Sequence, residues 1–223
     1  MGTNLTLTAE DGHELGAYRA DAQGSAKGGI VVIQEIFGVN AHIREVADGF
    51  AADGYLAIAP ALYDRSTTRG VDLGYDTEGM EKGRQYREEF SWDDSVLDVK
   101  AAAAVMQAEG LKVGTVGYCW GGTISYLAGC RLDVQAAVVY YGGQIMPYIG
   151  EAGRCPMLMH FGAQDKGIPL DDVRQIDAAH DEATVHIYDA DHGFNCDHRG
   201  QYDAEAAALA RQRTMAFYAE RLG

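Results

Sequence analysis

The sequence predicts an α/β protein with about eight strands in one mostly parallel sheet and helices covering both faces. Short apolar runs alternate with longer amphipathic segments, which is the pattern of strand and helix units packed into a parallel sheet. The chain has 223 residues, 47% of them hydrophobic and 23% charged, a balance that suits one domain over residues 1–223 with its own core. This composition excludes a disordered or fibrous chain.

Short apolar runs mark the expected strands. The buried strands are expected at residues 30–34, 56–59, 113–117, 136–140, 157–161 and 185–188. Near the N-terminus, residues 5–8 and 14–19 alternate apolar and polar side chains on either side of Asp11-Gly12. Alternation across such a turn predicts a hairpin, and we expect it at the edge of the sheet.

Two helices and one long loop complete the expected architecture. Ser91 followed by Asp94 resembles a capping box, and apolar residues then recur at helical spacing up to Gly110. The alanine-rich residues 202–222 predict a C-terminal helix of the same covering kind. Residues 64–76 are polar, contain glycine and lack periodicity, so they predict a long functional loop or lid.

Charge and hydropathy narrow the expected partners. Lys and Arg number 18 against 33 Asp and Glu, and the formal charge of -15 would repel phosphate backbones and anionic lipids. We therefore expect neither nucleic acid nor a membrane as partner. No apolar run approaches the ~20 residues of a membrane helix, and residues 1–10 lack signal-peptide features, which predicts a cytoplasmic protein. The sequence gives no indication of oligomeric state.

The most informative segment has the layout of a nucleophile elbow, in which a strand ends at the nucleophile and a helix begins. It reads Gly117-Tyr118-Cys119-Trp120-Gly121. Glycines on both sides allow strand and helix to approach closely, so the central residue can occupy a strained turn. The helix N-terminus would favour a thiolate at Cys119. Taken alone, the motif could also be a buried structural cysteine beside turn glycines.

Two further residues follow predicted strands in the order used by α/β-hydrolases. Asp165 comes after the penultimate strand and His192 directly after the last one. Nucleophile, acid and histidine therefore occur in the expected sequence order, each at the carboxyl end of a strand. Alone, each could be a turn or surface residue. Together they predict acyl transfer by a cysteine nucleophile, a histidine base and an orienting aspartate, with no cofactor.

These motifs and several neighbouring ones resemble the dienelactone hydrolase (carboxymethylenebutenolidase) family from about residue 28 to the C-terminus. The further motifs are Gln34-Glu35-Ile36-Phe37-Gly38-Val39-Asn40, Tyr140-Tyr141-Gly142, Gly162-Ala-Gln-Asp165 and His192-Gly193-Phe194. The resemblance implies an α/β-hydrolase fold and cleavage of a small ester or enol lactone. It also implies that Cys119 is the nucleophile, His192 the base and Asp165 its partner, and that the backbone N–H groups of Ile36 and Trp120 form the oxyanion hole.

Glu35 takes the place of a family glutamate that contacts the cysteine and helps to form the thiolate when substrate enters. A carboxylate beside a partly buried thiol keeps that thiol neutral while the site is empty, which protects it from oxidation. Glu35 could also be an ordinary loop residue. A charge directly after an apolar strand has no obvious packing reason, however, and this favours function.

The substrate contacts are expected to differ from those of the family. Relatives hold a substrate carboxylate with an Arg and a Tyr after the long loop, and with a Ser and an Arg after the histidine. Here Met80 and Arg84 stand at the first two positions, and Cys196 stands where the second Arg would be. The clamp is therefore expected to be incomplete. Arg84 or Arg87 could replace it, or could instead pair with glutamates on their own segment. Phe37 and Tyr141 are further expected contacts.

Three alternatives remain open at this point. The nearby residues His192, Cys196, Asp197 and His198 could bind zinc, but they lack a usual zinc-ligand spacing, so no metal is expected. The same triad could serve neutral esters or thioesters. A non-catalytic binding module on a hydrolase scaffold is the third alternative, since fold does not fix function. The joint presence of Cys119, Asp165, His192 and Glu35 argues against it.

Overall fold

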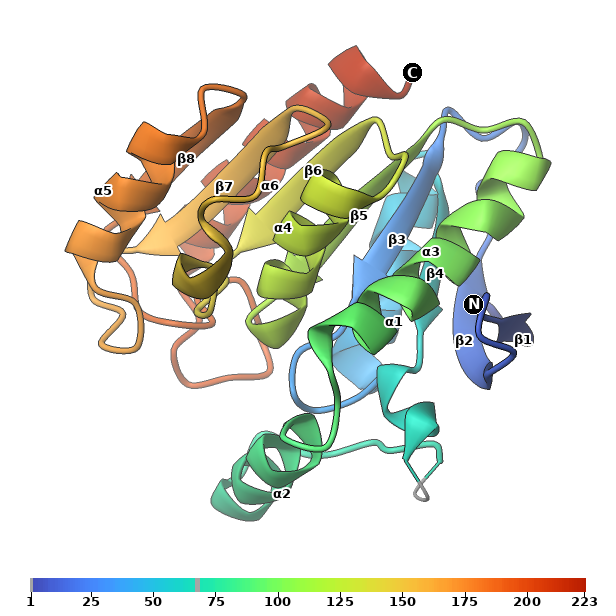
Figure 1. Cartoon of the computed structure of the whole chain (residues 1–223), viewed down its shortest axis with the longest axis horizontal. Coiled ribbons are helices and arrows are strands. Elements are labelled where there is room, and N and C mark those ends of the chain that lie inside the picture. Colours follow the sequence, from blue (N-terminus) through green and yellow to red (C-terminus); the bar gives the residue numbers. More distant parts are fainter. Residues whose placement is uncertain (1, 67–68) are drawn as a thin grey trace.

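The chain folds around one eight-stranded sheet with strand order β1-β2-β4-β3-β5-β6-β7-β8 (Figure 1). The computed structural model of the protein describes residues 2–66 and 69–223. The strands are β1 (Thr3–Thr8), β2 (Glu14–Ala20), β3 (Gly29–Ile33), β4 (Leu56–Pro60), β5 (Val113–Tyr118), β6 (Ala136–Tyr140), β7 (Met157–Gly162) and β8 (Ala183–Tyr188). Only the pairs β1–β2 and β2–β4 are antiparallel. The expectation of about eight strands in a mostly parallel sheet is confirmed.

The central strands are buried along their whole length, which explains their apolar composition. Every residue of β3, β4, β5, β6 and β7 is buried. Strands covered by helices on both faces carry continuous apolar runs instead of alternating ones. The predicted N-terminal hairpin is also present: β1 pairs antiparallel with β2, and Gly12 takes a φ of 85° in the turn between them.

Helices cover both faces of the sheet (Figure 1). The covering helices are α1 (Ala41–Ala52) and α6 (Ala204–Arg221) on one face, and α3 (Trp92–Ala108), α4 (Trp120–Arg131) and α5 (Leu170–Ala179) on the other. Helix α3 begins as predicted, because the Ser91 side chain accepts a hydrogen bond from Asp94 N–H at 3.0 Å. The expected C-terminal helix is α6, whereas α1 and α5 were not predicted.

The expected long loop at residues 64–76 is only partly irregular. Its first residues belong to a 3-10 helix (Leu62–Arg65), and Thr67 and Thr68 lie outside the described residues. An unpredicted helix, α2 (Thr77–Arg87), follows it and lies beyond the end of the sheet in Figure 1. The Asp76 side chain caps α2 by accepting Gly79 N–H at 2.7 Å. This segment therefore places a short polar helix close to the carboxyl ends of the strands.

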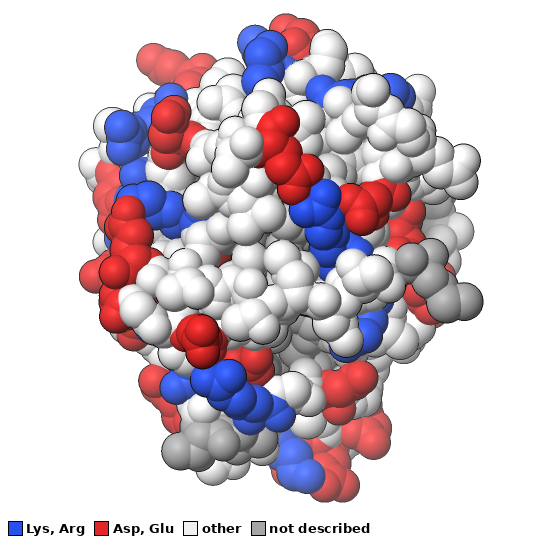
Figure 2. All heavy atoms as spheres, turned by 90° about the vertical axis from the view of Figure 1, so that its right-hand side faces the viewer, with Lys and Arg blue, Asp and Glu red and all other residues white. Residues whose placement is uncertain are grey.

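The face shown in Figure 2 carries charges of both signs, with Lys and Arg side chains lying among Asp and Glu side chains. No helix within residues 2–66 and 69–223 has both the length and the apolar character needed to cross a membrane.

Candidate active site

Cys119 lies in a strained turn between β5 and α4. Its φ of 56° and ψ of -115° are unfavourable for a residue with a side chain, and such strain often occurs at functional sites. The turn is held by the hydrogen bond from Cys119 N–H to Tyr140 O at 3.0 Å. A Cβ on Gly117 would collide with Gly121 O, and one on Gly121 would collide with Gln34 O. The two glycines are thus required for the close approach that holds Cys119 in this conformation.

His192 and Asp165 meet at the carboxyl ends of neighbouring strands. His192 Nδ1 lies 2.6 Å from Asp165 Oδ2. The other oxygen of Asp165 accepts Gly167 N–H at 2.8 Å, and the residue is only 6% exposed. The Tyr141 ring lies 5.0 Å from the imidazole, between ring centroids. The carboxylate is therefore fixed, and it holds one edge of the imidazole so that the other edge is available to Cys119.

Burial and the neighbouring Cys119 and Asp165 side chains set the pKa of His192. Burial lowers the pKa of His192, but the negative charge of Cys119 and hydrogen bonds with Asp165 and Cys119 outweigh this and raise the pKa to about 10. A protonated imidazole beside a thiolate is the reactive form of a cysteine and histidine pair. At neutral pH the raised pKa therefore favours a protonated imidazole beside Cys119.

A cavity of about 260 Å³ opens over this pair. Its lining combines side chains from the β3–α1 loop, from α2, from the elbow and from the segment after β8. These residues are Ile36, Phe37, Met80, Arg84, Arg87, Glu88, Cys119, His192 and Arg199. Cys119 and His192 thus share one small cavity with three arginines, which suits a compact substrate.

Glu35 is almost fully buried and forms an ion pair that the sequence does not predict. Its Oε1 accepts a hydrogen bond from Arg199 Nη1 at 2.9 Å, and the side chains of Glu35 and Arg199 are 1% and 11% exposed. Glu35 Oε2 has no hydrogen-bond partner among the described residues. The resting structure thus holds the carboxylate on an arginine that also lines the cavity.

Arg199 corrects the expectation that no arginine after His192 reaches the site. Cys196, at the position compared with the family arginine, is fully buried and does not line the cavity. Arg199 is the only Lys or Arg between His192 and α6, so considering the whole segment would have identified it. Counting a fixed number of residues beyond His192 failed because this segment follows an irregular path.

The two expected oxyanion-hole groups are both available. Among the described residues, neither Ile36 N–H nor Trp120 N–H has a protein acceptor. The Trp120 ring stacks on Tyr63 with centroids 5.4 Å apart, and Tyr63 OH donates to Ile36 O at 3.0 Å. Tyr63 therefore connects the two segments that carry these N–H groups. The Trp120 side chain itself does not line the cavity.

The other residues expected to contact the substrate differ in their burial and in whether they line the cavity. Arg87 is half-buried, and its Nη1 donates to Gln144 Oε1 at 2.6 Å, whereas Arg84 is exposed. Within the described part of the chain neither forms an ion pair, so pairing with nearby glutamates does not occupy them. Phe37 lines the cavity, with the Arg199 guanidinium 5.7 Å from its ring centroid. Tyr141 is fully buried beside His192, outside the cavity lining.

The strand order, the elbow with its strained cysteine and the histidine after the last strand define an α/β-hydrolase fold. Residues 15–222 match the model of the Dienelactone hydrolase family. The chain belongs to the dienelactone hydrolase family and is a hydrolase of that kind.

Individual relatives agree with this assignment. A carboxymethylenebutenolidase of Pseudomonas putida is 32% identical over 224 residues, which cover 96% of this chain and 95% of that protein. A relative from Synechocystis sp. is 38% identical over 203 residues, covering 82% of each chain. A crystal structure from Klebsiella pneumoniae superposes with a TM-score of 0.82 at 27% identity, covering 98% of this chain and 99% of that one.

Proposed function

We propose that the protein hydrolyses a small ester or enol lactone through an acyl-enzyme on Cys119. The observation that carries this proposal is the grouping of Cys119, in its strained elbow, with the Asp165–His192 pair in one cavity. The test is whether activity requires Cys119 and whether an acyl group can be trapped on its sulfur.

In the proposed reaction Glu35 accepts the Cys119 thiol proton when substrate enters, which leaves a thiolate beside protonated His192. The thiolate attacks the carbonyl carbon, and the oxyanion that forms accepts hydrogen bonds from Ile36 N–H and Trp120 N–H. The intermediate then expels the alkoxide or enolate, which takes the proton from His192. Water next attacks the thioester while neutral His192 accepts its proton, and the released acid leaves the thiolate and imidazolium restored.

The charges around the cavity favour a substrate with a carboxylate. Arg84, Arg87 and Arg199 all line it, and among the described residues Glu88 is the only acidic one in the lining. A guanidinium binds a carboxylate through charge-assisted hydrogen bonds. The Pseudomonas putida relative is described as a carboxymethylenebutenolidase, a name that indicates a lactone carrying a carboxymethylene group. We therefore propose a carboxylated enol lactone as substrate. Neutral esters or thioesters are the alternative.

Arg87→Gln should raise KM for a carboxylated enol lactone about 10- to 150-fold, the range expected for a lost hydrogen bond to a charged group. KM for a neutral ester of similar size should change much less. Arg84→Gln should have a smaller effect because Arg84 is exposed. Arg174→Gln, on the exposed face of α5, is the control. Steady-state kinetics on both substrates measure these effects. Equal changes for both substrates would place Arg87 outside the binding contacts.

Glu35→Gln should activate the thiol and yet slow turnover. Losing the carboxylate charge leaves the Arg199 guanidinium free to favour the thiolate, so alkylation of Cys119 at neutral pH should accelerate by roughly tenfold or less. Turnover should nevertheless fall, because the family resemblance implies that Glu35 accepts the thiol proton when substrate enters.

Glu88→Gln is the matched control, because it removes a negative charge from the same cavity without affecting the Arg199 pair. Alkylation rate and kcat/KM should be measured for both variants. Structural damage alone would depress turnover without faster alkylation. Unchanged values of both quantities in Glu35→Gln would make Glu35 an ordinary loop carboxylate.

A further inference from the structure

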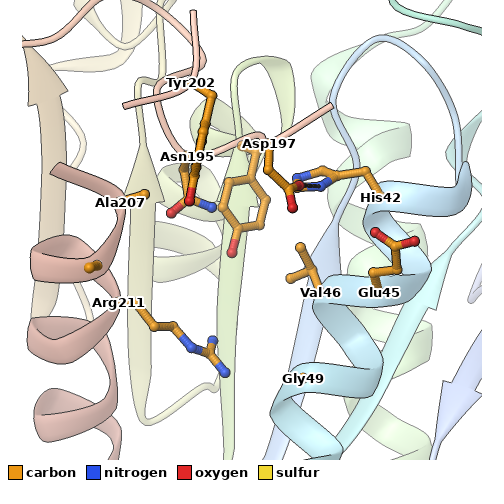
Figure 3. Close-up of a pocket in the computed structure, with 11 residues that line it drawn as sticks. His42, Glu45, Val46, Gly49, Asn195, Asp197, Tyr202, Ala207 and Arg211 are labelled. Carbon is orange, nitrogen blue, oxygen red and sulfur yellow. Dashed lines mark ion pairs between the residues drawn. The ribbon is translucent and has the colours of Figure 1, made fainter. Parts of the chain in front are cut away.

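A second group of ionisable side chains lies outside the catalytic cavity, between α1 and the segment that leads from β8 to α6. His42 and Glu45 project from the first turns of α1, three residues apart and therefore on one face of the helix. Asp197 and His198 come from the facing segment. Figure 3 shows His42, Glu45 and Asp197 around one pocket, with the Asp197 carboxylate directed at the imidazole. This pocket has a volume of about 340 Å³.

The four side chains are close enough to share one ion. One ligand atom from each lies within 4.8 Å of the others. Glu45 Oε2 is 2.8 Å from His198 Nε2, and Asp197 Oδ1 is 3.4 Å from His42 Nδ1 and 3.9 Å from His198 Nε2. Ligand atoms at tetrahedral zinc, with bonds of about 2.0 to 2.1 Å, are about 3.3 Å apart. The observed separations lie on both sides of this value, so small side-chain rotations would complete the geometry.

The burial of His42 without a hydrogen-bond partner is a separate indication of a missing ligand. Its side chain is only 5% exposed, yet neither ring nitrogen makes a hydrogen bond within the described part of the chain. Nε2 is buried without a partner, and Nδ1 only approaches Asp197 at 3.4 Å. Buried imidazoles normally have their hydrogen-bonding capacity satisfied. A metal bound beside Asp197 would take His42 Nδ1, the ring nitrogen that faces this carboxylate and makes no hydrogen bond within the described residues.

The cluster differs from the zinc site that sequence proximity suggests. Proximity groups Asp197 and His198 with His192 and Cys196. The structure instead commits His192 to Asp165 and buries Cys196, while α1 supplies the two other members of the cluster. Sequence proximity therefore identified half of the cluster and missed the half contributed by α1.

We propose that His42, Glu45, Asp197 and His198 form a site for a divalent transition metal, with Zn²⁺ as the best fit. Two imidazoles and two carboxylates suit zinc and its neighbours, whereas Mg²⁺ and Ca²⁺ prefer oxygen ligands throughout. The ion joins α1 to the segment that carries both His192 and Arg199. Its role is to stabilise that segment, and the proposal is independent of the hydrolytic reaction.

Zinc binding to the chelator-stripped full chain should be measured by isothermal titration calorimetry. One equivalent of Zn²⁺ is expected to bind to the wild type. Glu45→Gln and His198→Ala, both at exposed positions, should each weaken binding tenfold or more. His13→Ala, in the N-terminal hairpin, is the matched control and should bind like the wild type. Cys119→Ala should also retain the site, because the catalytic thiol is not a ligand.

Two further readouts separate this site from metal capture by the catalytic cysteine. Co²⁺ should give visible absorption without the intense thiolate charge-transfer band that a cysteine ligand produces. At a free Zn²⁺ concentration 100 times Kd, Tm should rise by about 5 to 10 °C in the wild type and much less in His198→Ala. Absence of binding, loss of binding in Cys119→Ala, or unchanged binding in both Glu45→Gln and His198→Ala would overturn the proposal.

Discussion

Cys119→Ala is expected to lower kcat/KM for ester hydrolysis by roughly four orders of magnitude or more. The cysteine supplies the bond-forming atom, so its loss removes covalent catalysis and leaves only substrate binding and oxyanion stabilisation. The change should leave folding intact, because Cys119 lies at the edge of the cavity and is not part of the fully buried core. Kinetics with a short aryl ester measure the effect, and thermal unfolding checks the fold.

Cys130→Ala is the matched control for this prediction. Cys130 is a buried thiol in α4, the helix that begins directly after Cys119, and it lies away from the cavity lining. Burial raises the pKa of Cys130 to about 11, so this residue stays a neutral thiol at working pH. Activity should persist in Cys130→Ala. Hydrolysis that survived Cys119→Ala with its rate unchanged would contradict the assignment of the nucleophile.

His192→Gln should cause the second largest loss, about 10³- to 10⁴-fold in kcat/KM. The variant removes both the cation that pairs with the thiolate and the base that activates water. Asp165→Asn should cost less than His192→Gln, because His192 remains and only its orientation and charge stabilisation are weakened. The steady-state rates of the two variants give this order. The opposite order would contradict the roles assigned to His192 and Asp165.

The raised pKa of His192 also predicts a pH dependence. Because the pKa rises from its usual value of 6.5 to about 10 in the folded protein, the protonated imidazole stabilises the fold fully below about pH 6.5. This contribution is lost as the pH rises through about 10. NMR titration of the imidazole should show the raised pKa in the wild type and a lower one in Asp165→Asn. A wild-type pKa near 6.5 would mean that the charged pair does not form.

The parts of the fold that could be predicted are those set by local patterns. The buried strands are apolar along their length, so β3, β5, β6 and β7 are visible in the sequence alone. The positions of Cys119, Asp165 and His192 followed from the same patterns, because parallel strands bring their carboxyl ends to one edge of the sheet. A site built from residues directly after strands is therefore accessible to sequence reasoning.

The parts that could not be predicted depend on contacts between distant segments. Helix α2 is polar and has only Gly79 and Gly83 buried, so it carries no apolar stripe by which to recognise it. Arg199 reaches Glu35 across 164 positions of the sequence, and no local pattern specifies that pair. The cluster of His42 with Asp197 has the same origin. Contacts between charged groups that are distant in the sequence can be identified only from the three-dimensional structure.

Trapping the acyl-enzyme tests the central claim most directly. The wild-type protein should be mixed with a slowly hydrolysed aryl ester, quenched in acid and analysed by intact-mass and peptide mass spectrometry. One acyl group should be found on the peptide that contains Cys119, formed at the rate of phenol release and absent from Cys119→Ala. An acyl group on another residue would contradict the proposed mechanism. A rapid burst of phenol release by the wild type without any adduct would contradict it as well.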